Sequence, residues 1–180
     1  PIQPRESAEI NERDHKSNRT PEVNMPVLVV IDTQIADFET LFEGLAPGVE
    51  FLLLEPDQDG VRQIANYLRG KSGYDAVHIF SHGSPGSLQL GSSLVTEASL
   101  DDYRPELNTI GSALTDSGDM LLYGCNVSEG EVGQQFIQAL AVATNTDVAA
   151  SSNMTGSVWQ GGDWILETAT AAIEATPVEI

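Results

Sequence analysis

The sequence predicts an α/β fold: a helix-flanked, mostly parallel sheet of five to six strands, followed by a C-terminal β-hairpin. Short apolar runs alternate with amphipathic stretches along the chain, which favours βαβ units and a parallel sheet. The runs are continuously apolar, as in strands that are covered on both faces. A length of 180 residues suits one domain.

Five short apolar runs are the expected strands. They carry branched and aromatic residues and are bounded by turn residues, as strands usually are. In order, the expected strands are Val27–Ile31, Val49–Leu54, Asp75–Phe80, Met120–Tyr123 and Asp147–Ala150.

Helices are expected between these strands. Asp57 or Asp59 can cap a helix that ends near Arg69, before Gly70, and Pro105 marks a break or a start within the third helix. The expected helices are Ile35–Phe42, a segment from the Asp57 or Asp59 cap to Arg69, Leu100–Leu114 and Val132–Thr144. A Gly-Gly turn within 159–164 predicts the C-terminal hairpin.

The charge distribution divides the chain in two. Residues 1–25 carry four of the eight basic residues and little apolar periodicity, so we expect a flexible lead-in segment there. Residues 26–180 form the single predicted domain. The formal net charge of the whole chain is -19.

This acidity excludes several classes of partner. Phosphate backbones and anionic membrane surfaces repel an acidic face, so neither nucleic acid nor membrane insertion is expected. No apolar run is long enough for a membrane span, and the first residues carry no signal-peptide pattern. One cysteine forms no internal disulfide, so the fold needs no oxidising compartment.

Chemistry is expected at the carboxyl ends of two strands. His82 follows the strand 75–80, and Cys125 follows the strand 120–123. Sites in parallel sheets lie outside these strand ends, and adjacent strands are about 5 Å apart. Acyl transfer uses a thiolate as nucleophile, an imidazole that transfers the proton, and backbone N–H groups that bind the oxyanion. The loops that contain Gly83 and Gly124 can supply such N–H groups.

The order of these motifs resembles that of the caspase-like cysteine peptidases, which include caspases, gingipains and clostripain-like enzymes. The chain is more closely similar to the DUF4347 family, which is found near the N-termini of large bacterial surface and adhesin-like proteins. The similarity runs from about Pro26 to Glu167. Its carriers are His78–Gly86, Leu121–Asn126 and Gly161–Trp164.

The resemblance implies a cysteine endopeptidase of caspase-like three-layer architecture that cleaves a polypeptide, including its own parent chain. Cys125 would be the nucleophile and His82 the general acid, and the amides of Gly83 and Cys125 would form the oxyanion hole. Asp32 would line the pocket for the side chain before the cut bond and favour Arg or Lys. In the lead-in, Arg13, Lys16 and Arg19 would then be self-cleavage points. A secreted or cell-surface location follows from the family context alone.

Other interpretations stay open. Asp32 can instead cap the following helix, and His78 is expected to be a core or sheet-face histidine. The whole domain can be a non-catalytic module that binds a peptide or partner. Fold class alone also suggests a flavodoxin-like binder of a small ligand.

We expect a monomer without a cofactor. The one exception is calcium, which the acidic surface could gather weakly. The segment Glu55–Gly60 imitates half of a calcium loop, but Asn66 stands at position twelve, where such a loop has a bidentate acid.

Overall fold

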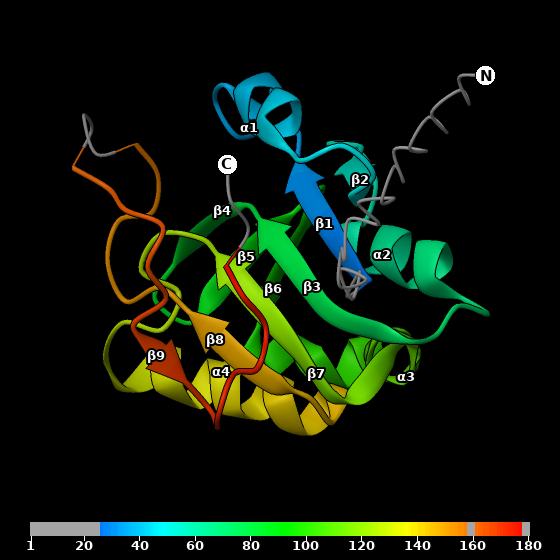
Figure 1. Ribbon diagram of the computed structural model, residues 1–180. Coiled ribbons are helices and arrows are strands. Elements are labelled where there is room, and N and C mark those ends of the chain that lie inside the picture. Colours follow the sequence, from blue (N-terminus) through cyan, green and yellow to red (C-terminus); the bar gives the residue numbers. More distant parts are fainter. Residues whose placement is uncertain (1–25, 158–160, 178–180) are drawn as a thin grey trace, which may run out of the picture.

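The computed structural model describes residues 26–157 and 161–177, so the expected lead-in, residues 1–25, lies outside the described residues. Six strands form the central sheet in the order β2-β1-β3-β7-β8-β9 (Figure 1). Strands β1 to β8 of this sheet pair in parallel, and β9 is antiparallel to β8. The strands are β1 (Val27–Asp32), β2 (Glu50–Leu54), β3 (Tyr74–Phe80), β7 (Leu114–Tyr123), β8 (Asp147–Ala150) and β9 (Thr168–Ala169).

The sheet is buried because its strands are apolar on both faces. In β1, Leu28 and Val30 point into one core cluster, and Val29 and Ile31 point into another on the opposite face. All four are fully buried. This alternation is what a continuous apolar run produces when both faces of a parallel sheet are covered.

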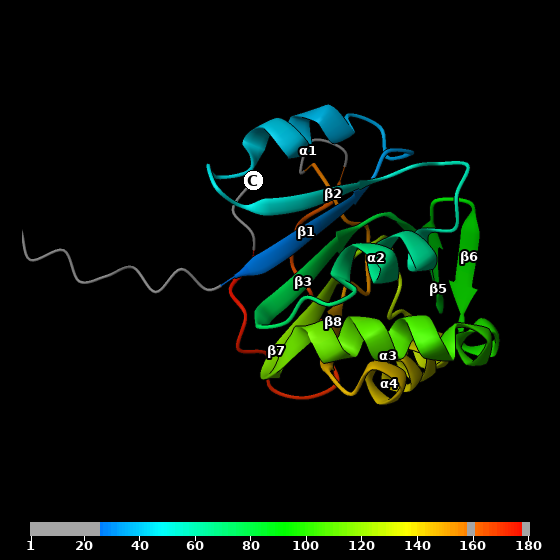
Figure 2. The same cartoon turned by 90° about the vertical axis from the view of Figure 1, so that its right-hand side faces the viewer.

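Three helices cover one face, namely α2 (Gly60–Leu68), α3 (Arg104–Ala113) and α4 (Gly130–Thr144). They pack side by side, as Figure 2 shows, and place Ile64, Ile110 and Phe136 in the larger core cluster. Asp59 caps α2: its side chain accepts a hydrogen bond from the Arg62 N–H at 3.1 Å. Asp59, and not Asp57, is therefore the cap.

The opposite face is covered by α1 (Phe38–Gly44) and by the C-terminal segment. Leu41 of α1 is buried in the second core cluster, and Leu166, Ile173 and Ala175 of the C-terminal segment pack against it. Figure 1 shows this segment (orange to red) crossing in front of the sheet. Helices, sheet and this covering layer form three layers, which confirms the predicted helix-flanked, mostly parallel α/β fold.

A second, three-stranded antiparallel sheet was not expected from the sequence. It comprises β4 (His82–Ser84), β5 (Ser87–Leu90) and β6 (Ser93–Thr96). Pro85 and Gly86 make the turn between β4 and β5, with Gly86 at a φ of 73°. Such short strands have too little periodicity to distinguish them from a loop. Leu88 and Val95 nevertheless bury this sheet against the main core.

Three predicted elements differ in the structure. The first helix begins at Phe38, three residues later than expected, because residues 33–37 form turns. The predicted helix 100–114 is a 3-10 helix, η1 (Glu97–Tyr103), followed by α3, with Pro105 in the first turn of α3. The predicted C-terminal hairpin falls partly on residues 158–160, outside the described residues. In its described part, Asp163 forms an isolated parallel bridge with Thr155, and the antiparallel pairing lies further on, at β8–β9.

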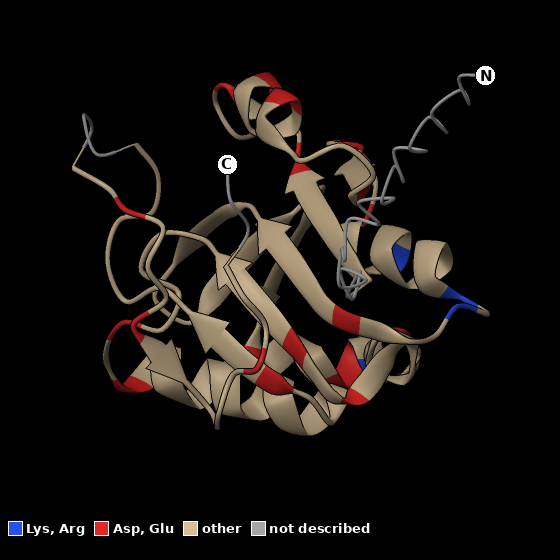
Figure 3. Cartoon of the chain, viewed as in Figure 1, with Lys and Arg blue, Asp and Glu red and all other residues tan. Residues whose placement is uncertain are grey.

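Acidic positions are spread over helices, loops and strand ends, as Figure 3 shows. Basic residues are few: residues 26–180 contain Arg62, Arg69, Lys71 and Arg104 against 22 acidic residues. Within the described ranges, no helix has the length and apolar character required to cross a membrane.

Candidate functional site

An open pocket of about 720 Å³ lies at the carboxyl ends of the central strands. Its lining comes from helix α1, from the ends of β3 and β7, from the turns that follow β1, β3 and β7, and from residues 154–157 and Trp164. The strand order reverses between β1 and β3, since the chain leaves β1 for β2 on one side and then returns to β3 on the other. Ligands of open α/β sheets bind at such a switch point.

Aromatic rings form part of the pocket lining. Phe80 and Tyr123, the last residues of β3 and β7, stack with ring centroids 4.4 Å apart and planes at 4°. Trp164 meets both rings edge-on, at centroid distances of 5.6 and 6.2 Å. A surface of this kind accepts an apolar side chain or the aliphatic stem of a long basic one.

His82 lines this pocket and is exposed. Its Nε2 lies 3.1 Å from the backbone carbonyl oxygen of Gln34, in the turn after β1. A carbonyl oxygen only accepts hydrogen bonds, so Nε2 carries the proton. In the neutral ring, Nδ1 is then the atom that can take up a proton.

Cys125 lines the same pocket and is half-buried. Its thiol donates a hydrogen bond to the Thr155 carbonyl oxygen, with a sulfur–oxygen distance of 3.7 Å. The turn that carries Cys125 is bound to the neighbouring loop through Asn126 N–H to Asn153 O at 2.7 Å and Ser128 N–H to Ser151 O at 3.0 Å. No hydrogen bond joins the side chains of His82 and Cys125 among those found in the described part of the chain.

Gly83 lies directly against the Cys125 turn. A Cβ built on Gly83 would be 2.6 Å from Val127 Cγ2 and 2.9 Å from the Cys125 carbonyl oxygen. Only glycine permits this approach of two backbones. The His82 and Cys125 turns, 43 positions apart in the sequence, are therefore in contact.

Two backbone amides at this contact are available to a ligand. In the β4–β5 hairpin, Ser84 pairs with Ser87 across a two-residue turn, so the next pair, Gly83 with Leu88, is a non-hydrogen-bonded one. The Gly83 N–H therefore points away from β5. The Cys125 N–H makes no hydrogen bond among the described residues.

Asp32 lies at the end of β1, but it does not belong to the pocket lining in the described structure. It is fully buried, and one carboxylate oxygen accepts a hydrogen bond from Gly91 N–H at 2.7 Å. The other accepts from Gln34 N–H at 2.9 Å. Asp32 is therefore not placed to contact a substrate side chain in this pocket, contrary to the expectation from the sequence. Its carboxylate instead holds the Gly91 turn and the turn after β1, without capping α1.

His78 lies within β3, buried on the face covered by the C-terminal segment. Its Nδ1 and the Tyr123 hydroxyl are 3.4 Å apart, at the long end of hydrogen bonding. Burial lowers the pKa of His78 from 6.5 to about 4. The expectation that His78 is a core histidine is met.

Sequence reasoning missed several residues of the pocket. Asp37 is the one carboxylate among its described lining residues, and Trp164 and Met154 come from segments far along the chain. Asp37 is the N-cap residue of α1, with a φ of 60°, and its side chain makes no capping hydrogen bond. No periodicity predicts which loop residues meet across 120 positions, because tertiary packing alone decides it.

The fold and site define a three-layer α/β domain with a histidine and a cysteine in one pocket at the carboxyl ends of its strands. A family model described as Domain of unknown function (DUF4347) matches residues 28–179. The chain belongs to this family. No curated protein matches it.

Proposed function

We propose that this domain is a caspase-like cysteine endopeptidase that acts on a polypeptide, including its own parent chain, with Cys125 as nucleophile and His82 as general acid–base. One observation carries the proposal: the two side chains line the same pocket, after the neighbouring strands β3 and β7. We include in the proposal that the parent chain is a secreted or cell-surface protein.

The proposed reaction passes through a thioester. The Cys125 thiol gives its proton to His82, the sulfur attacks the carbonyl carbon of the peptide bond, and His82 returns the proton to the leaving amine. Water then hydrolyses the thioester, which restores the thiol and releases the carboxylic acid. Because His82 Nε2 is hydrogen-bonded to the Gln34 carbonyl oxygen, Nδ1 is the His82 atom that exchanges the proton.

The two available amides support an oxyanion hole. The N–H groups of Gly83 and Cys125 are not taken up by the β4–β5 hairpin or by another described residue. A carbonyl oxygen that becomes negative at this contact would accept hydrogen bonds from both. Loss of one such donor typically lowers kcat by about 10²–10³-fold.

Pocket chemistry supports Asp37 as the specificity residue in place of Asp32. A substrate Arg or Lys would lay its stem against Phe80 and Trp164 and bring its charge to the Asp37 carboxylate at the exposed rim. Asp37→Asn should therefore weaken cleavage after basic residues through KM. If cleavage after basic residues is unchanged in this variant, Asp37 has no such role.

The test compares the precursor chain with its Cys125→Ala and His82→Ala variants by intact mass. We expect a defined cut in the wild-type chain and none in either variant. Ser84→Ala is the matched control, because Ser84 is exposed, lies two residues after His82 in β4 and does not line the pocket, so this variant should cut like the wild type. Cleavage that survives in Cys125→Ala, or an uncut wild type, contradicts the proposal.

The second candidate, a non-catalytic peptide-binding module, is favoured by the hydrogen bonds of the two side chains. The Cys125 thiol donates to Thr155, and His82 bonds to Gln34, so each already has a backbone partner. Alkylation of the single cysteine by iodoacetamide separates the candidates. A thiol that reacts faster in the folded chain than in the denatured one supports the peptidase, and one that is protected by folding supports the binding module.

A further inference from the structure

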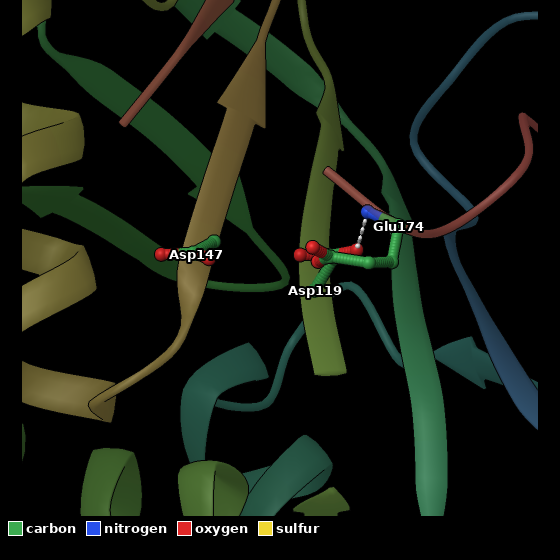
Figure 4. Close-up of side chains that lie close together, drawn as sticks. All are labelled: Asp119, Asp147 and Glu174. Atoms are coloured by element: carbon green, nitrogen blue, oxygen red, sulfur yellow. Dashed lines mark hydrogen bonds between the residues drawn. The ribbon is translucent and has the colours of Figure 1, made fainter. Parts of the chain in front are cut away.

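Three carboxylates from distant segments gather at the opposite end of the sheet from the pocket. Asp119 of β7 and Asp147 of β8 are register partners in parallel strands, so their side chains leave the same face. Glu174 belongs to the C-terminal segment that covers this face. One side-chain oxygen from each of the three lies within 4.8 Å of the other two (Figure 4).

Asp119 has an oxygen that no described residue satisfies. The residue is fully buried, and its Oδ2 accepts hydrogen bonds from the N–H groups of Glu174 and Ala175, each at 2.8 Å. Its Oδ1 is buried and has no hydrogen-bond partner in the described structure. Figure 4 shows that this oxygen faces away from the Glu174 N–H, on the side where Asp147 lies. A buried carboxylate oxygen without a partner is strongly destabilising, which points to a missing ligand.

Within residues 26–157 and 161–177, no basic side chain forms an ion pair with this cluster. The ion pairs among the described residues involve Arg62, Lys71 and Arg104, and none reaches Asp119, Asp147 or Glu174. Burial raises the pKa of Asp119, and the nearby Glu174 and Asp147 charges act in the same direction. A proton on Asp119 would relieve part of this repulsion, but a divalent cation would satisfy all three carboxylates at once.

We propose that Asp119, Asp147 and Glu174 bind one calcium ion, which fastens the C-terminal segment to β7 and β8. All three donors are hard carboxylate oxygens, the type that Ca²⁺ prefers. Ca–O bonds of about 2.3–2.6 Å place oxygens on opposite sides of the ion roughly 4.6–5.2 Å apart, and adjacent ones closer. The observed spread of 4.8 Å fits this range. Asp147 is half-buried and Glu174 exposed, so water can complete the coordination.

The site is independent of the proposed peptidase activity. It lies in the middle of β7 and at the start of β8, whereas His82 and Cys125 follow the ends of β3 and β7. Loss of calcium binding would therefore leave the peptidase proposal intact, and an inactive Cys125 would leave the calcium proposal intact.

Isothermal titration calorimetry of the full chain with CaCl₂, at physiological ionic strength, tests the proposal, because salt screens diffuse binding to acidic surfaces. We expect one saturable site in the wild type. Affinity should fall at least about tenfold in Asp119→Asn and Asp147→Asn, since each loses one charged ligand. Asp119→Asn keeps an oxygen for the Glu174 and Ala175 N–H groups, so the fold should persist; circular dichroism checks this. Asp102→Asn is the matched control, because Asp102 is exposed and the charge change is the same.

Thermal unfolding is a second measurement, which tests the proposal even if an Asp119 or Asp147 variant does not fold. Calcium should raise the Tm of the wild type and of Asp102→Asn, and the rise should be absent in Glu174→Gln, whose side chain lies on the surface. Equal binding in the wild type and Asp119→Asn, or no saturable binding in the wild type, overturns the proposal and leaves a proton on Asp119 as the explanation. Equal affinity for Mg²⁺ also overturns the assignment to calcium.

Discussion

The buried His78 predicts a specific loss of stability in mild acid. Its side chain is 1% exposed, and its pKa is about 4 in the fold against 6.5 ordinarily. Well above pH 6.5 both the folded and the unfolded chain hold this ring neutral, so the shift has no effect on stability there. As the pH falls from 6.5 to 4, the unfolded chain binds a proton that the folded chain does not, and stability is lost.

The size of the effect follows from the shift. Each pKa unit corresponds to about 1.4 kcal/mol, so the full loss below pH 4 is roughly 3 kcal/mol. Between pH 7 and pH 5 the expected loss from this single residue is about 2 kcal/mol. This range lies above the pH at which most carboxylates titrate.

Urea unfolding of the wild type and His78→Asn, at several pH values from 7 to 5, measures the effect. The Asn variant loses packing, which lowers its free energy of unfolding equally at every pH. The difference between the two proteins should therefore shrink by about 2 kcal/mol from pH 7 to pH 5.

Val29→Ala is the control, since Val29 is buried beside His78 in the sheet and carries no titratable group. Its difference from the wild type should stay constant with pH. A constant difference for His78→Asn as well would refute the reasoning, because His78 would then titrate alike in both states.

Two further variants test local contacts. Gly83→Ala should lower stability by about 1–3 kcal/mol in urea unfolding, because its Cβ would meet Val127 and the Cys125 carbonyl; an unchanged midpoint contradicts the contact. Asp59→Ala should cost about 1–2 kcal/mol, since Asp59 caps α2 and accepts a hydrogen bond from the Tyr103 hydroxyl at 2.7 Å. Asp59→Asn, which keeps the cap, should lose less, and equal losses in the two variants would argue against capping.

Local sequence predicts much of the sheet. The run that begins at Val27 carries enough branched apolar residues to identify a strand, and its continuous apolarity indicates that both faces of the strand are covered. Asp59 and Gly70 mark the start and end of α2, because helix caps act within one turn. These features need only neighbours in the chain.

Other elements depend on distant contacts. The strands β4 to β6 are too short to show a period, and the core formed with Leu88 and Val95 holds them. Pro105 marks a break or a start in the sequence, but it does not reveal that the preceding segment is the 3-10 helix η1, whose Leu100 is buried.

The sequence by itself determined the strand–helix alternation and placed His82 and Cys125 directly after strands, because both follow from patterns of neighbouring residues. Only the tertiary structure made β3 and β7 neighbours in the sheet. Only the tertiary structure decided that the Asp32 carboxylate accepts a hydrogen bond from the Gly91 N–H, while Asp37 lines the pocket. It alone also brought Asp119 and Glu174 together. The physical reason is that a side chain's partners depend on which distant backbones meet, and local propensity carries no information about such meetings.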